Sequence, residues 1–454
     1  MSPPPQASAP LGRAVLFAYG LPGLPLAALL LPLYVTLPTF YAVDLGLGFF
    51  TVGALLLVAR LWDVVTDPVI GSLSDRLTTR FGRRRPWLLA GAPLVMVSAG
   101  FLFLPAPGAG GTGLLAWTMV LYLGATMILL PYNAWGAELS PDYHERSRIA
   151  GWREGLVVLG TLLAAGLPAV VGAERSAALE VIAWALWIVL PLCLVIAICF
   201  VPEPSAAVPQ PLAWRRGLTV LWRNGPFRRL IAAYFLNGIA NGLPASLFLL
   251  YVELVLEMPQ WSGFLLFVYF LCGIAAIPLW LRLSRRWGKH RTWAGAMVWA
   301  AVFFAFVPLL GPGDHLWFLA VCVLTGVSLG ADLTLPASMQ ADVIDLDTLR
   351  SRRSRAGLYF ALWGVATKLA LALAVGIAFP LLALAGLEPG REASAPEGLF
   401  ALAALYSLLP AAIKLTSVAL VIGFPITAVR QQRIRRLIAV RAARRRPEET
   451  VCEN

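Results

Sequence analysis

The sequence predicts an all-helical membrane protein with about twelve transmembrane helices arranged in two six-helix bundles. Its 454 residues are 59% hydrophobic and only 13% charged, and the mean hydropathy is +0.77. A soluble protein of this length could not cover so much apolar surface. Because a span needs about 20 apolar residues and the loops are short, the chain has room for roughly twelve spans and for no large soluble domain. A cytosolic enzyme, a disordered scaffold and a single-anchor receptor are therefore excluded.

The expected spans follow from apolar windows between charged residues. They lie near 14–42, 49–74, 87–105, 112–140, 150–172, 178–202, 229–256, 261–283, 293–311, 316–338, 357–387 and 399–428. Basic residues follow the even-numbered spans, whereas the opposite loops hold acids with few bases. We therefore expect a multi-pass protein of the cell (inner) membrane with both termini cytoplasmic. The net charge of +12 reflects this topology, so we expect no nucleic-acid partner.

The longest polar interval is rich in proline and arginine and divides the chain near its middle. It predicts a cytoplasmic linker between two bundles. The expected parts are a cytoplasmic N-terminus at 1–13, a first bundle at 14–202, the linker at 203–228, a second bundle at 229–428 and a basic cytoplasmic tail at 429–454.

The two halves also resemble each other. LSDRLTTRFGRRRPW at 73–87 has a counterpart in LSRRWGKHRTW at 283–293, and LPYNAWGAE after the fourth span has one in LPASMQAD after the tenth. Both pairs are separated by a similar offset, which predicts one duplication of a six-span unit. Basic loops would look alike through topology alone, but that does not explain the shared L-P, A-[ED] and R-[FW]-G elements.

Charged residues inside spans are scarce, and each costs roughly 2.5–3.5 kcal/mol at a helix centre. Arg60, Asp63 and Asp67 in RLWDVVTDP are spaced to share one face of the second span. Two carboxylates beside one guanidinium leave a negative site, which suits a small cation or an exchangeable proton. The alternative is an Arg–Asp tie that only locks helices together.

Lys368 stands alone deep in the eleventh span and should meet a carboxylate from another helix. The candidates are Asp63, Asp67 and Asp332 in GADLTLP of the tenth span. Arg153 begins the fifth span in AGWREG, where it either grips a polar or anionic solute or marks the membrane boundary.

Further candidates come from polar and aromatic side chains in spans. Asn237 and Asn241 in FLNGIANG either bind solute hydroxyls or form interhelical hydrogen bonds. Tyr359 and Trp363 are expected on a cavity face.

The loop after the second span is expected to act as a gate. Asp75 and the run Arg83, Arg84 and Arg85 should hold the cytoplasmic helix ends together in the outward-facing state.

Three stretches resemble the glycoside–pentoside–hexuronide:cation symporter family, the melibiose-carrier-like branch of the major facilitator superfamily. They are RLWDVVTDPVIGSLSDRLTTRFGRRRPWLL, PYNAWGAELSPDYHERSRIAGWR and ADVIDLDTLRSRRSRAGLYFALWGVATK. The resemblance implies the major facilitator fold, with Asp63 and Asp67 binding the coupling Na+ or H+. It also implies that Arg153 and Lys368 belong to the substrate and charge-coupling region.

Departures from this pattern bear on the solute. The sugar-binding acids of the melibiose carrier's first and fourth helices fall here on Pro22 and Leu129, and an aromatic residue falls on Asn133. A galactoside is therefore not expected, and Asn133 joins the candidate solute contacts.

The sequence thus predicts a secondary active transporter that couples Na+ or H+ to symport of a sugar or related small polar solute by alternating access. The alternative is a lysolipid, amphiphile or drug transporter of the same fold. No GxxxxGK[ST], HExxH or GxSxG motif is present, so no enzyme is expected. We expect a monomer whose partners are the solute, the coupling cation and the bilayer, with no cofactor and no metal beyond a possible Na+ at the paired acids.

Overall fold

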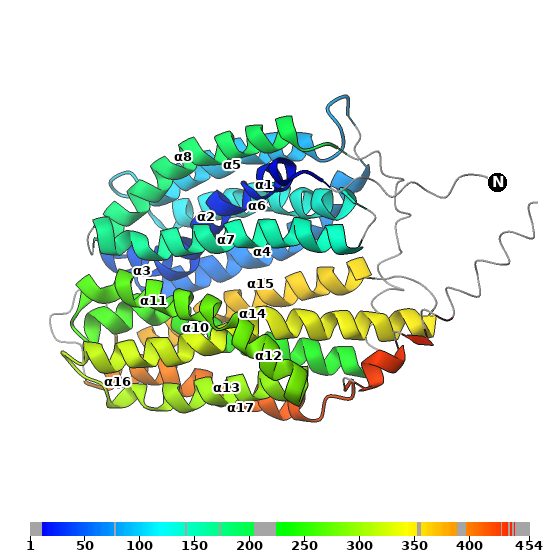
Figure 1. The fold of residues 1–454 in the computed structure, drawn as a ribbon. Coiled ribbons are helices and arrows are strands. Elements are labelled where there is room, and N and C mark those ends of the chain that lie inside the picture. Colours follow the sequence, from blue (N-terminus) through cyan, green and yellow to red (C-terminus); the bar gives the residue numbers. More distant parts are fainter. Residues whose placement is uncertain are drawn as a thin grey trace, which may run out of the picture. The chain divides into compact units, whose positions relative to one another are not determined.

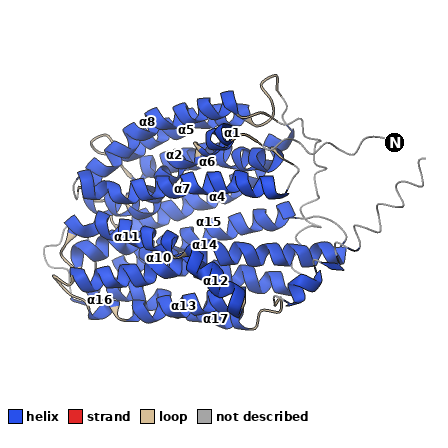
Figure 2. Ribbon diagram, in the orientation of Figure 1, coloured by secondary structure: helices blue, strands red, loops and turns tan. Residues whose placement is uncertain are grey.

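The described part of the computed structural model consists of helices joined by loops and turns (Figure 2). The described residues are 11–76, 79–140, 143–171, 174–203, 224–351, 356–387, 396–427, 429–434, 436–437 and 440. Most of the linker and of the C-terminal tail expected from the sequence lies outside these ranges. Among the described residues the only bridge of β type joins Thr79 to Gly82, in the turn after the second span.

Eleven helices of the described part are long and apolar enough to cross a membrane. A twelfth span results if two segments bent by 41°, Pro259–Ala275 and Ile277–Trp287, are counted as one. The break falls at Ala276, two residues before Pro278, whose ring cannot continue the preceding hydrogen-bond ladder. The expected all-helical membrane architecture is confirmed.

The chain forms two compact units. The first comprises Met1–Gln210, Ala245–Phe267 and Val375–Leu402, and the second comprises Pro211–Pro244, Val268–Ala374 and Ala403–Asn454. The boundaries therefore run through helices as well as between them. The bundle limits expected from the sequence stay a prediction.

The helices of the first unit are labelled in Figure 1. Its first 210 residues hold α1 (Arg13–Gly20), α2 (Gly23–Val35), α3 (Leu37–Thr39), the π-turn η1 (Phe40–Asp44), α4 (Phe49–Arg76), α5 (Arg85–Phe103), α6 (Gly111–Glu138), α7 (Tyr143–Val171) and α8 (Arg175–Phe200). Helix α6 packs against both α4 and α5, and α2 packs against α7. The first expected span, 14–42, is thus broken into shorter helices, with Pro22 at the break between α1 and α2.

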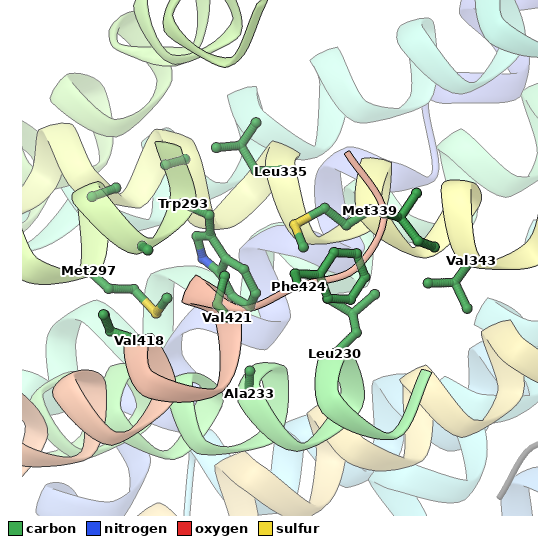
Figure 3. Packing of buried hydrophobic residues seen from close by; sticks show 14 of the residues in the cluster. Leu230, Ala233, Trp293, Met297, Leu335, Met339, Val343, Val418, Val421 and Phe424 are labelled. Carbon is green, nitrogen blue, oxygen red and sulfur yellow. The ribbon is translucent and has the colours of Figure 1, made fainter. Parts of the chain in front are cut away.

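The second half of the chain contributes the remaining helices. They are α10 (Gly225–Leu254), η2 (Pro259–Trp261), α11 (Ser262–Ala275), α12 (Ile277–Trp287), α13 (Lys289–Ala305), η3 (Val307–Leu309), α14 (His315–Ser351), α15 (Ala356–Leu384), α16 (Pro396–Ala403), η4 (Ala404–Leu408) and α17 (Leu409–Ile422). Helix α13 packs against α14 and α17. An apolar cluster in the second unit includes Trp293, Met297, Met339 and Phe424 (Figure 3).

Close helix packing in both units depends on glycine. A Cβ on Gly160 of α7 would lie 2.2 Å from the carbonyl oxygen of Leu24, and one on Gly330 of α14 would lie 2.4 Å from that of Gly273. Backbone atoms cannot yield as a flexible side chain can. These positions therefore fix how neighbouring helices cross, as small residues do in membrane bundles.

A candidate cation and solute site with two buried ion-pair networks

Two acids of α4 meet a threonine of α6. Thr126 Oγ1 lies 3.0 Å from Asp63 Oδ1 and 2.8 Å from Asp67 Oδ1. Asp63 and Thr126 are buried, and Asp67 is half-buried. The expectation that Asp63 and Asp67 share one face of the second span is confirmed, because one hydroxyl from a neighbouring helix contacts both.

Arg60 completes this cluster. Its Nη1 donates to Asp63 Oδ2 at 2.9 Å, and its Nη2 donates to the hydroxyl of Tyr34. Its guanidinium carbon lies 4.9 Å from the ring centroid of Tyr34 and 4.0 Å from that of Tyr122, so aromatic faces supply cation–π contacts. The guanidinium is thereby held against Asp63 in a site with almost no solvent contact.

Thr126 was missed by sequence reasoning. Threonine is common in apolar helices, and its contact with Asp67 spans 59 residues of sequence. Only the packing of α6 on α4 reveals the contact. The formal charges of Arg60, Asp63 and Asp67 sum to −1.

Arg153 lies near the start of α7, where three polar side chains meet. It donates from Nε to Glu154 at 3.2 Å and from Nη1 to the side-chain oxygen of Asn133 on α6. Asn133 is exposed, and Arg153 keeps about a quarter of its side chain accessible. The structure therefore brings together two of the expected solute contacts.

Tyr19 and Tyr132 lock the helices beside this group. The Tyr19 hydroxyl donates to the Tyr132 carbonyl at 3.1 Å, and the Tyr132 hydroxyl donates back to the Tyr19 carbonyl at 2.5 Å. A Cβ on Gly136 would collide with the Tyr19 hydroxyl at 1.9 Å. This reciprocal pair holds α1 and α6 in one register.

The expected contacts of the second half fall in different environments. Asn237, Asn241 and Asp332 converge on Lys414 of α17, which sequence reasoning did not single out. Lys414 could have been found by the criterion applied to Lys368, since both are lone lysines in apolar spans. Lys368 is half-buried on α15. Its pairing with Asp63 or Asp67, which belong to the other unit, stays a prediction.

The two aromatic candidates of α15 also differ. Tyr359 is fully buried, packs edge-on against Phe227 and accepts a hydrogen bond from Asn224 at 2.9 Å. Its expected place on a cavity face is therefore corrected to the core of the second unit. Trp363 is half-buried and stacks on Tyr234, with ring centroids 3.8 Å apart.

The basic loop expected to act as a gate is anchored within the first unit. Arg84 donates to Glu138 at 2.6 Å, and Arg83 pairs with the same carboxylate at the end of α6. The backbone N–H groups of Arg83 and Arg84 donate to Glu203, which also lies 3.4 Å from Arg85. Asp75 is the last residue but one of α4, and its side chain lies outside what the structure describes.

These partners stabilise the charged form of Glu138. Burial alone would raise its pKa, but the hydrogen bonds and charges of Arg84 and Arg83 outweigh burial and lower the pKa below its usual value.

The same arrangement recurs in the second unit. Lys289 follows a glycine of positive φ, as Arg83 does, and it pairs at 2.5 Å with Asp342, the acid that follows an alanine in α14. The internal duplication predicted from sequence thus extends to a repeated ion pair.

A second ion-pair group lies at the start of α8. Arg175 pairs with Asp44 at 2.6 Å and with Glu253 of α10. A crevice beside it is lined by apolar side chains of α2, α7, α8 and α10, among them Leu31, Ala164 and Leu249. All these residues belong to the first unit.

Comparisons with solved structures identify the fold. The nucleoside transporter NupG matches with a TM-score of 0.67 at 11% identity, covering 92% of this chain and 100% of that one. A D-xylose–proton symporter matches with a TM-score of 0.66 at 13% identity, covering 91% and 97%. Both are major facilitator transporters, which confirms the expected major facilitator fold and, at these identities, the fold alone.

Comparisons of sequence point to symporters. The chain is 28% identical over 428 residues to the human "Sodium-dependent lysophosphatidylcholine symporter 1", covering 85% of this chain and 78% of the relative. It is 27% identical over 425 residues to the Escherichia coli "Putative glycoside/cation symporter YagG", covering 89% and 90%.

The family itself follows from a match over most of the chain. Residues 18–428, which include every expected span except the first few residues of the first, match the family described as MFS/sugar transport protein. The resemblance inferred from the acid motif of the second span is confirmed, and a transporter rather than an enzyme is established. The chain belongs to the MFS/sugar transport protein family.

Proposed function

We propose that this chain is a Na+-coupled symporter in which Asp63, Asp67 and Thr126 hold the coupling cation. One observation carries the proposal: Thr126 Oγ1 contacts a carboxylate oxygen of each acid, at 3.0 and 2.8 Å. A hydroxyl has a single hydrogen and cannot donate it fully to two acceptors. The second short contact is favourable when a positive charge, either a metal cation or an acid proton, lies among the three oxygens.

The choice of Na+ rests on chemistry and on relatives. Carboxylate and hydroxyl oxygens are ligands that hard cations prefer. The human relative is named as sodium-dependent, which favours Na+ over H+. One bound monovalent cation would neutralise the charge of −1 on Arg60, Asp63 and Asp67.

We propose an amphiphile with a polar head and an acyl chain, of the lysolipid class, as the solute. The human relative named as a lysophosphatidylcholine symporter supports this class. The apolar residues Pro22 and Leu129, where the melibiose carrier has sugar-binding acids, also favour an apolar ligand over a hydroxyl-rich one.

Helix α7 supports the same class of solute. It is the least buried of the candidate spans in the described part of the chain. Leu159, Leu163 and Val170 are exposed and lie on one face at helical spacing, and this face begins six residues beyond Arg153. A guanidinium binds phosphate oxygens in a fork, so Arg153 suits an anionic group at the head of such a solute.

A glycoside is the second candidate. The relative named as a glycoside/cation symporter supports it, and Asn133 offers an exposed amide beside Arg153 that suits hydroxyl groups. In either case transport would proceed by alternating access, with Lys368 in charge coupling and the Arg83–Arg85 loop, together with Asp75, at a cytoplasmic gate. We keep both termini on the cytoplasmic side and a monomer as parts of the proposal.

The proposal is tested by uptake into cells that express the protein. Radiolabelled lysophosphatidylcholine and a radiolabelled disaccharide are supplied separately, in Na+ medium and in medium where choline replaces Na+, and albumin washes remove surface-bound lipid. We expect Na+-dependent lysophosphatidylcholine uptake and no disaccharide uptake. Asp67→Asn should abolish the Na+ dependence, whereas the matched control Asp314→Asn, in a loop acid that caps a turn, should keep it.

Other outcomes discriminate between the parts of the proposal. Disaccharide uptake without lysolipid uptake would replace the solute class but keep the cation site. Uptake driven by an acid-outside pH gradient and indifferent to Na+ would assign a proton to the acids. Uptake by Asp63→Asn and Asp67→Asn with unchanged Na+ dependence would overturn the cation site.

A further inference from the structure

Lys414 of α17 is a charged residue that is buried in the protein, with an exposed fraction of 1%. Its ammonium donates to Asn237 Oδ1 at 2.9 Å and to Asn241 Oδ1 at 2.7 Å, and it lies 3.5 Å from Asp332 Oδ2. Three oxygens from α10 and α14 therefore surround one positive charge. All four residues belong to the second unit.

Asp332 is satisfied on both of its oxygens. Trp293 Nε1 donates to Oδ1 at 2.7 Å, and Asn241 Nδ2 donates to Oδ2 at 3.0 Å. Trp293 is itself fixed, because its ring is fully buried in the apolar cluster of this unit (Figure 3). The carboxylate is thus held in one position with the ammonium as its charge partner.

An ammonium surrounded by these oxygens can replace a bound cation. It is a compact point charge with three donors, and here each donor has one oxygen to meet. A carboxylate inside a membrane needs a compensating charge, and Lys414 supplies one that cannot leave. The pair Lys414 and Asp332 is neutral, whereas the acid cluster of the first unit carries −1.

We propose that Lys414 is a covalently attached cation filling a monovalent-cation site made by Asn237, Asn241 and Asp332. The second unit therefore exchanges no cation, and each transport cycle couples to one. The number of one coupling cation per transport cycle rests on the proposed cation site at Asp63 and Asp67. The proposal that Lys414 fills the second site does not rest on it.

The test measures binding of radiolabelled Na+ to the purified full chain by equilibrium dialysis. Wild type should bind one ion, Lys414→Ala two, and Asp63→Asn/Asp67→Asn none. The triple variant that adds Lys414→Ala to the two asparagine substitutions should bind one. Adding Asp332→Asn to Lys414→Ala should return the number to one, because the vacated site then lacks its carboxylate. Ammonium ion should compete with Na+ at the new site, since it replaces the missing group.

The outcomes separate the two proposals. Lys414→Ala that gains no ion in either background overturns the inference. If Asp63→Asn/Asp67→Asn still binds an ion, adding Asp332→Asn shows where that ion binds. Loss of the ion shows an exchangeable site beside Lys414 and overturns the inference. Retention of the ion overturns only the proposed site at the paired acids. This last comparison needs no Lys414 variant, so it decides even where Lys414→Ala fails to fold. The inference then requires that adding Asp332→Asn to Asp63→Asn/Asp67→Asn removes no ion.

Discussion

Arg175 and Glu253, which come from opposite halves of the sequence, form an ion pair within the first unit. Arg175 also binds Asp44 at 2.6 Å, so one guanidinium joins the end of η1, the start of α8 and the end of α10. Its side chain is only 13% exposed. The Arg175–Glu253 pair therefore ties residues 245–267 to the start of α8, and the Arg175–Asp44 pair ties α8 to η1.

Arg175→Ala should loosen this junction. We expect the free energy of unfolding to fall by about 2 kcal/mol, because the substitution removes charge-assisted hydrogen bonds to two acids. A cysteine placed at Ser262, beside the crevice, should also react faster with a water-soluble maleimide. The control is Arg148→Ala, whose partner Glu145 lies in the same helix. Equal labelling rates in the two variants would contradict a joining role for Arg175.

Thr126→Val should weaken cation binding with little effect on the fold. The substitution keeps shape and removes the hydroxyl shared by the two acids, which is worth about 1.5–3 kcal/mol for a hydrogen bond to a charged group. We therefore expect Na+ affinity, measured by thermal stabilisation, to fall roughly tenfold to a hundredfold. Thr66→Val is the matched control, since that buried hydroxyl donates to the backbone oxygen of Asp63 at 3.1 Å. If the control loses as much affinity, Thr126 is not a ligand.

Glu138 should make stability depend on pH. Its pKa is lowered in the folded protein by Arg84 and Arg83, so its contribution is complete above the unfolded pKa of about 4.3 and is lost as pH falls through the folded value. Thermal unfolding in detergent should show wild type losing stability on acidification. Glu138→Gln should be less stable near neutrality by about 2 kcal/mol and should depend less on pH, because two arginines lose their partner.

The control for this measurement is Glu180→Gln, in an exposed acid whose hydrogen bond to Trp184 is long at 3.4 Å. It should follow the wild-type pH profile. A Glu138→Gln profile parallel to that of wild type would show that other groups cause the acid sensitivity.

Lys368 should be coupled energetically to the paired acids. If the ammonium competes with the coupling cation, Lys368→Ala should tighten cation binding while slowing turnover. Combining it with Asp63→Ala should then cost less than the two separate losses predict. Initial rates and cation affinities of the three variants check this. Simple additivity would remove Lys368 from the coupling step.

Sequence alone predicted the membrane class, the duplication and the acid pair, because each depends on composition or on spacing within a few turns. The ion pairs Arg83–Glu138 and Lys289–Asp342 show why the duplication was visible: repeated local sequence makes repeated contacts. Thr126 could not be predicted, since its role arises from helix packing. Lys414 was visible as a lone charge in the last span, but its three oxygen partners lie at least 82 residues away in the sequence.

The prediction that Tyr359 lies on a cavity face was wrong for a different reason. An aromatic residue in a span faces lipid, a cavity or the core with similar sequence patterns, and only neighbours decide among them. Here Asn224 and Phe227, from the start of α10, enclose the ring.

The division of α10 at Pro244 and Ala245 between the two units has a consequence for the polypeptide as a whole. A peptide bond cut between residues 204 and 223 would leave residues 245–267 and 375–402 on the second fragment, yet both segments pack within the first unit. The two fragments, produced from separate genes in one cell, should therefore hold together through these shared helices and be purified as a single complex. The covalent link between the halves is then dispensable for assembly.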